Sequence, residues 1–377
     1  MNFQWDTHQV EMREAISRFA RSELTGIAHS VDEFKKAWRK CAVMGVQGLT
    51  VDTQYGGLGA DYLTTVAALE ALGKACEDNG FLFSLNAHMW ACQYPIQRFG
   101  SQEQKERYLP RLCDGSLIGA HAMSEPGSGS DAFSLTTTVT STEKGYTLRG
   151  SKTFVTNAPI ADVFVVFARA PGTEAFSGIS SFILYRDTDG LEVGSPVEKM
   201  GLEGSYMADV FFDDCEIPKA QLLGRAGRGA GIFVDAMEHE RAMILASAIG
   251  SMERTFENSI TYALERRQFG QPISRFQAVS HRLADMKTRL EASRLLLYRL
   301  AWLLDQGEPV GLESAMVKLH LSESYVATAF DAVQIHGGYG YLKEYGVERE
   351  LRDAVGSQLY SGTSDIQRNL IARHLGL

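Results

Sequence analysis

The sequence has few cysteines, no excess of basic residues and no long hydrophobic run. Its five cysteines (Cys41, Cys76, Cys92, Cys113 and Cys215) are scattered without a CxxC pair. This pattern is typical of reduced, buried thiols and argues against a disulfide framework or a zinc site. The chain has 37 Lys and Arg against 46 Asp and Glu, a formal net charge of −9. No basic excess is therefore available to neutralise the phosphates of a nucleic acid.

No stretch approaches the roughly 18 apolar residues of a membrane-spanning helix. Residues 1–6 lack the basic and apolar regions of a signal peptide. The chain also has no internal repeat, no low-complexity segment and neither a GxGxxG nor a Walker motif, which argues against a Rossmann or P-loop nucleotide site. We therefore predict a soluble, cytoplasmic protein with no metal site.

The 377 residues, 45% of them hydrophobic and 22% charged, are typical of a globular protein with a large core. From about residue 7 to 114 apolar residues recur at the three- and four-residue spacing of helices. Short β-branched and aromatic runs follow, and helix-length periodicity returns after residue 232. The sequence predicts a mainly α fold with a central β domain: an N-terminal helical domain over 1–118, a middle β domain over 119–227 and a C-terminal helical domain over 228–377.

Three clusters of glycine and hydroxyl residues are candidates for ligand binding. Residues 123–131 read MSEPGSGSD, and a second cluster surrounds Gly337 and Gly338. In the third, Gly362 and Thr363 predict a turn that opens the last helix, with backbone donors directed at a polar ligand. Glycines let a backbone approach a ligand that a Cβ would exclude. An ordinary helix cap or polar loop would contain the same residues, so each cluster alone leaves both readings open.

Taken together, these clusters resemble the signatures of the acyl-CoA dehydrogenase family of flavoenzymes. The resemblance runs from about residue 9 to 377. It implies an N-terminal helical domain, a middle β-barrel, a C-terminal four-helix bundle and FAD as the cofactor. It also implies a homotetramer whose subunits share flavin contacts, and an electron acceptor such as an electron-transfer flavoprotein.

The resemblance assigns roles to residues near the flavin. The Ser124 position binds the pyrimidine edge, Phe154 replaces a usual tryptophan over the isoalloxazine ring, and Thr156 donates its hydroxyl to N5. Arg266 lies at the position of a diphosphate contact from a neighbouring subunit. The predicted cofactor-binding residues are Met123, Ser124, Gly129, Ser130, Phe154, Thr156, Arg266, Gln268, Phe269, Gln334, Gly337, Gly338, Thr363 and Asp365.

The sequence departs from the family at the catalytic base. The family usually has a glutamate before the Gly-Thr pair, where this chain has Ser361. A serine hydroxyl is too weak to remove a thioester α-proton without an activating partner. The segment MEHERA (237–242) resembles the isovaleryl-type branch, in which the base precedes an arginine, so Glu240 is the predicted base and Arg241 follows it. Glu238 remains an alternative, because about 200° of helix separates the two and the flanking residues do not decide which faces the pocket.

We therefore predict an oxidoreductase that desaturates an acyl thioester, with the α-proton passing to Glu240 and the β-hydride to flavin N5. The predicted substrate contacts are Ser130, Arg241, Tyr360 and Ser361. The pattern is similar to dehydrogenases acting on acyl or prolyl groups tethered to carrier proteins, although acyl-CoA remains open. A flavin-dependent monooxygenase or oxidase, or a non-catalytic flavin-binding subunit, would be the alternative on this scaffold.

Overall fold

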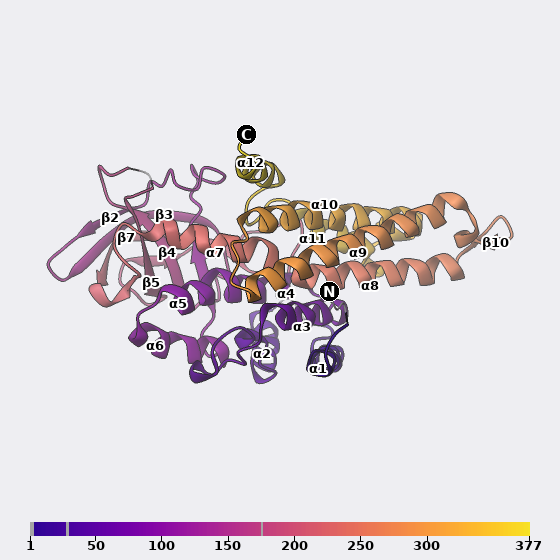
Figure 1. Cartoon of the computed structure of the whole chain (residues 1–377), viewed down its shortest axis with the longest axis horizontal. Coiled ribbons are helices and arrows are strands. Elements are labelled where there is room, and N and C mark those ends of the chain that lie inside the picture. The colour runs from indigo at the N-terminus through magenta and orange to yellow at the C-terminus, as the bar shows by residue number, and fades with distance from the viewer. Residues whose placement is uncertain (1–3, 28–29, 175) are drawn as a thin grey trace.

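A computed structural model describes residues 4–27, 30–174 and 176–377. Helices come first, then strands, then helices, so the predicted order is confirmed (Figure 1). The sheet lies at one end of the long axis and the longest helices extend to the other (Figure 1). Within the described residues, no helix is both long and apolar enough to cross a lipid bilayer.

Five of the six N-terminal helices that the structure describes, all except α5 (Tyr94–Phe99), begin at Ser or Asp caps. Asp6, Ser30, Asp61, Asp78 and Ser101 each accept a hydrogen bond from the backbone N–H three residues on, which satisfies a donor that the first helical turn leaves free. The helices are α1 (Thr7–Glu23), α2 (Val31–Val43), α3 (Tyr62–Ala75), α4 (Asn79–Asn86), α5 (Tyr94–Phe99) and α6 (Gln102–Cys113), with a π-helical segment (Ala87–Gln93) between α4 and α5.

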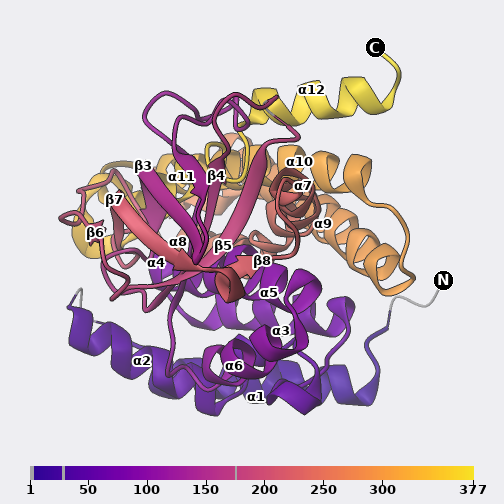
Figure 2. The same cartoon turned by 90° about the vertical axis from the view of Figure 1, so that its left-hand side faces the viewer.

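The middle of the chain forms one eight-stranded sheet. The strands are β1 (Gly119–Ala122), β2 (Thr138–Ser141), β3 (Gly145–Thr156), β4 (Val163–Arg169), β5 (Ile179–Tyr185), β6 (Leu191–Val193), β7 (Met207–Pro218) and β8 (Leu222–Leu223). Their order is β6-β7-β3-β2-β4-β5-β8, and β1 pairs with β4 in parallel. Helices α5, α6 and α7 lie along one side of this sheet (Figure 2). The β3–β7 register shifts between Lys152 and Val155, and such a bulge redirects side chains.

The C-terminal region consists of long helices and a small hairpin. These elements are α7 (Gly229–Met243), α8 (Ala246–Glu265), β9 (Arg267–Gln268), β10 (Gln271–Pro272), α9 (Gln277–Asp305), α10 (Gly311–His336), α11 (Val347–Gly356) and α12 (Ser364–His374). Helix α8 packs directly against α3: a Cβ on Gly73 would lie 1.9 Å from the Ser247 carbonyl oxygen. One buried core therefore joins the N-terminal and C-terminal helices, and residues of α4 and α7 belong to it.

Candidate active site

Glu240 is buried on α7, with only 7% of its surface exposed. Its Oε1 accepts a 2.7 Å hydrogen bond from the Ser361 hydroxyl, 121 residues away in sequence. Its Oε2 is buried without a hydrogen-bond partner among the described residues. Glu238 lies elsewhere: its Oε1 is beside the start of α10, 3.1 Å from where a Cβ on Gly311 would be. Of the two glutamates that the sequence left open, Glu240 is therefore the one that faces Ser361.

The surroundings of Glu240 suit a general base. Burial raises the pKa of its carboxyl to about 7, against the opposing effects of the Ser361 hydrogen bond and the positive charges of Arg241 and Lys318. Exclusion from water disfavours the charged form of a carboxyl group. A base whose pKa lies near the working pH exists as carboxylate in a useful fraction and also binds a proton strongly enough to remove one.

Ser361 lies in a strained turn between α11 and α12. Its φ is +52° and that of Gly362 is +89°, and a non-glycine residue persists in this left-handed region only when its surroundings hold it there. The Gln367 amide donates to the carbonyl oxygens of Ser361 (3.3 Å) and Gly362 (2.9 Å). Among the hydrogen bonds of the described residues, none uses the Ser361 N–H. This N–H is therefore available as a donor beside the predicted base.

The hydroxyl of Ser361 stabilises the carboxylate form of Glu240, so its removal should change the pH dependence of turnover. In Ser361→Ala the pKa of Glu240 is expected to rise above its value of about 7, because the donor is lost. A base is active when deprotonated, so the acid limb of the kcat/KM profile should move to higher pH. A pH series with wild type and Ser361→Ala, read as initial rates, checks this; a shift to lower pH would contradict it.

The predicted flavin residues of the sheet domain lie together. The Thr153 N–H donates to the Ser124 carbonyl oxygen (2.9 Å), which joins the loop after β1 to β3. Phe154, at φ +54° in the β3 bulge, is 69% exposed. Ser124 and Thr156 are both partly exposed, while Met123 is buried. An exposed aromatic ring next to hydroxyl donors fits a planar polar ligand such as an isoalloxazine ring.

Two contacts of α4 connect this group with Glu240. The Asn157 amide donates to the carbonyl oxygens of Ser84 on α4 and Gly119 on β1 (both 3.1 Å). The next residue towards the N-terminus of α4, Phe83, packs its ring against Tyr360, with centroids 4.5 Å apart. Tyr360 directly precedes Ser361. Helix α4 therefore contacts both the segment of the predicted flavin residues and the turn beside the predicted base.

An ion pair that sequence reasoning missed supports the loop after β1. Lys152 and Glu125, with side chains 0% and 1% exposed, approach to 2.8 Å, and Lys152 Nζ also donates to the Met123 carbonyl oxygen (2.9 Å). Burial alone would raise the pKa of Glu125, but Lys152 and the Thr136 hydroxyl lower it to about 2. The sequence does contain a signal for this ion pair, namely a lysine inside an otherwise strand-like run beside the predicted flavin residues.

A second group of predicted cofactor residues lies around the β9–β10 hairpin, at the end of the long axis opposite the sheet (Figure 1). A cavity of about 470 Å³ there is lined by Tyr262, Arg266, Gln268, Ile273, Ile335, His336, Gly337, Gly338, Tyr339 and Leu342. The Arg266 guanidinium lies 5.2 Å from the Tyr339 ring centroid. Apart from their chain neighbours, no described residue lies within 4 Å of a Cβ placed on Gly337 or Gly338. A guanidinium, aromatic rings and open glycines fit the diphosphate and adenosine of a dinucleotide.

The remaining predicted residues are less enclosed. Phe269 is 92% exposed at the tip of the β9–β10 hairpin, and Gln334 is exposed on the last turn of α10. Gly129 and Ser130 lie on an exposed loop of the sheet domain. Thr363 caps α12 by accepting from the Ile366 N–H (3.3 Å). Asp365 is exposed and pairs with Arg368, so one chain does not bring all the predicted cofactor residues together.

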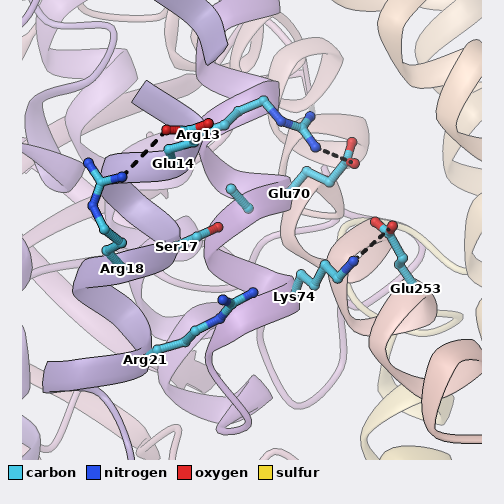
Figure 3. Close-up of a pocket in the computed structure, with 9 residues that line it drawn as sticks. Arg13, Glu14, Ser17, Arg18, Arg21, Glu70, Lys74 and Glu253 are labelled. Carbon is cyan, nitrogen blue, oxygen red and sulfur yellow. Dashed lines mark hydrogen bonds and ion pairs between the residues drawn. The ribbon is translucent and has the colours of Figure 1, made fainter. Parts of the chain in front are cut away.

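A polar hollow between α1, α3 and α8 is separate from this site (Figure 3). Its lining residues are Arg13, Glu14, Ser17, Arg18, Arg21, Glu70, Ala71, Lys74 and Glu253. Arg13 pairs with Glu70 (3.5 Å) and Lys74 with Glu253 (3.0 Å). Most of its charges are thus matched by neighbours, and it contains no residue predicted to bind cofactor or substrate. We assign it no part in the chemistry.

Comparison with known proteins covers the whole chain. Residues 6–116, 120–215 and 227–376 match the N-terminal, middle and C-terminal domains of acyl-CoA dehydrogenase. The chain is 42% identical over 380 residues to an L-prolyl-[peptidyl-carrier protein] dehydrogenase of Pseudomonas fluorescens, covering 100% of both. It is 42% identical over 371 residues to a Bacillus subtilis acyl-CoA dehydrogenase, covering 97% of each. The solved structure of PigA with FAD and proline is 40% identical, with a TM-score of 0.97 and 100% of both chains covered.

Proposed function

The chain belongs to the acyl-CoA dehydrogenase family, and from this premise we propose that it desaturates a short acyl or aminoacyl thioester on a carrier protein, with Glu240 as the base. The enzyme is an FAD-dependent oxidoreductase that dehydrogenates acyl thioesters at the α,β-bond. One observation carries the assignment of the base: Glu240 is buried, bonded to Ser361 and left with one carboxylate oxygen free.

The geometry supports a division of roles among the residues. Glu240 removes the α-proton of the thioester through Oε2, which has no other partner. As that proton leaves, the thioester oxygen gains negative charge, and the free Ser361 N–H is a donor for it. The chemistry that bound FAD would supply is acceptance of the β-hydride, so that both C–H bonds would break as the α,β double bond forms. Phe154, Ser124 and Thr156 would hold the isoalloxazine ring. Helix α4 contacts both the segment that follows Thr156 and Tyr360, which precedes Ser361.

We further propose that FAD is held between two subunits. Most of its predicted contacts form two groups, one in the sheet domain and one around Arg266. The sheet and the β9–β10 hairpin beside Arg266 lie at opposite ends of the long axis (Figure 1). A second chain that presents its Arg266 cavity to the sheet domain would complete the cofactor site, in a dimer or in the homotetramer implied by the family resemblance. Sedimentation velocity of the holoprotein checks this, since a monomer with tightly bound FAD would contradict it.

Carrier tethering is supported by the names of the relatives and by the combination of Glu240 with Ser361. The test is anaerobic: purified holoprotein is mixed with prolyl and short acyl thioesters, each prepared on CoA and on a carrier protein, and the flavin absorbance is followed. We expect bleaching by a carrier-bound thioester at least about tenfold faster than by the matching CoA ester. Equal or faster bleaching by the CoA ester would refute the carrier preference but not the dehydrogenation.

One feature of the site also fits a flavin-dependent oxidase or monooxygenase: Ser361 occupies the position at which the family usually has its base. An oxidase or monooxygenase would consume oxygen in steady state with the same thioester. Oxygen uptake is therefore measured after the anaerobic mixing, with an electron-transfer flavoprotein as the competing acceptor. Flavin that no thioester bleaches would refute the dehydrogenase assignment for the compounds tested.

A further inference from the structure

Lys318 is a buried cation that the roles above leave unused. It lies on α10 with a fully buried side chain. It forms no ion pair with a carboxylate among the described residues, unlike the buried Lys152. A lysine is rarely buried without a paired charge, because removing an ammonium group from water is costly. Its position therefore needs an explanation in terms of what its ammonium group contacts.

The ammonium group binds both ends of the turn that carries Ser361. Nζ donates to the Ser357 carbonyl oxygen (2.5 Å) and to that of Gly362 (3.3 Å), and it lies 5.4 Å from the Tyr360 ring centroid. Ser361 lies between these anchors in its left-handed conformation. Lys318 thus closes the turn from the α10 side, while Gln367 holds it from the α12 side.

The charge of Lys318 also acts on the base. The pKa of Lys318 is lowered to about 7, mainly by burial and also by the Arg241 charge, while the Glu240 charge acts in the opposite direction. In return, the Lys318 charge lowers the pKa of Glu240. Besides each other, Arg241 on α7 acts on both groups and the Ser361 hydroxyl acts on Glu240. Tyr360 packs against the Lys318 ammonium, and its own pKa is raised by burial and by Asp353 and Glu240. The ammonium and the carboxylate thus each favour the charged form of the other.

We propose that Lys318 is a positioning residue of the reaction: it holds the Ser361 turn against Glu240 and supplies a positive charge that favours the carboxylate form of the base. This proposal rests on Glu240 being the base. Lys318 touches neither the predicted flavin residues nor Glu240 directly, so it acts through the turn and through its field.

The chain offers a matched control for the two parts of this role. Gln367 is fully buried and donates to the same Gly362 carbonyl oxygen as Lys318, but it carries no charge. Its Oε1 has no hydrogen-bond partner among the described residues, so Gln367→Met loses little besides the contacts to the turn. Lys318→Met loses contacts to the same turn and the positive charge as well.

The test compares pH profiles of kcat/KM for wild type, Lys318→Met, Lys318→Arg and Gln367→Met, each checked for bound flavin. Both methionine variants should lose about 10- to 100-fold in kcat/KM, because the Ser361 donor is displaced. Displacement of the Ser361 hydroxyl should move the acid limb to higher pH in both variants. Lys318→Met should move it further, since a positive charge near a carboxyl group lowers its pKa. Lys318→Arg, which keeps the charge, should have its acid limb near that of wild type.

An acid limb that stays in place in Lys318→Met, or that moves equally in Gln367→Met, would overturn the role of the charge. If Lys318→Met does not fold, Lys318→Arg and Gln367→Met still test it: a limb that moves further in the arginine variant than in Gln367→Met refutes the role of the charge. Glu240→Gln is run in parallel. Undiminished activity in that variant refutes the base, whereas an inactive Glu240→Gln beside an unaffected Lys318→Met refutes only the positioning role.

Discussion

Glu240→Gln is expected to lower the rate of flavin reduction by a thioester by about 10²- to 10⁴-fold while FAD remains bound, because this is the contribution that a positioned base makes to such a reaction. Glutamine keeps the size of the side chain and can still accept a hydrogen bond from Ser361, whose contact with Glu240 is 2.7 Å long. It cannot take up the α-proton. The measurement is anaerobic stopped-flow absorbance of the flavin after mixing with the best substrate of the thioester panel.

Glu238→Gln is the matched control for that variant. Glu238 is two residues away on the same helix, carries the same charge and lies beside Gly311 instead of Ser361. We expect Glu238→Gln to reduce flavin at nearly the wild-type rate. A wild-type rate of flavin reduction in Glu240→Gln together with a lower rate in Glu238→Gln would make Glu238 the base. Wild-type rates in both variants would show that neither glutamate is the base.

The wild-type pH profile should reflect the same residue. A buried carboxyl with a pKa of about 7 is protonated and inactive below that pH and is active as carboxylate above it, so kcat/KM should fall as the pH drops below about 7. Adding Ser361→Glu to Glu240→Gln places a carboxylate on the facing turn, at the family's usual position for the base. Partial recovery of flavin reduction in this double variant would support proton removal from the same side of the substrate.

The order of helices, strands and helices and the candidate residues of the site could be read from the sequence, but the choice between two glutamates could not. Helical periodicity puts Glu238 and Glu240 about 200° apart, yet it does not say which face of α7 is covered. That is decided by the turn at Ser361, which is separated from Glu240 by 121 residues of chain. Motifs therefore named the candidates, and only packing between distant segments selected one.

The two buried lysines were missed for a different reason. In a sequence, Lys152 and Lys318 look like the solvated charges that most lysines are. Their burial depends on acceptors supplied by other segments: Glu125 and the Met123 carbonyl oxygen for Lys152, and the Ser357 and Gly362 carbonyl oxygens for Lys318. Local patterns of hydrophobicity contain no information about such acceptors. Both lysines contact a turn that carries residues of the predicted site.

Lys152→Met should therefore destabilise the protein and loosen FAD. The substitution leaves the Glu125 carboxylate buried without its cation, and breaking a buried pair from one side costs about 3–5 kcal/mol. Three donors from Thr136 and Thr137 remain on Glu125, so we expect the lower part of that range. The Met123 carbonyl oxygen also loses its donor, next to Ser124. Urea unfolding of the apoprotein and the flavin-to-protein absorbance ratio measure the two effects.

The double variant Lys152→Met with Glu125→Gln separates the charge from the packing. Glutamine removes the isolated carboxylate, and replacing both members of a buried pair is much less costly than removing one. We expect the double variant to recover stability relative to Lys152→Met, because the penalty comes from the unpaired charge. The pH supplies an independent check: in Lys152→Met the pKa of Glu125 should rise from its value of about 2, so acid should protonate the stranded carboxyl and narrow the difference from wild type. A single variant as stable as wild type at neutral pH, or a double variant less stable than the single one, would show that the ion pair does not hold this loop in place.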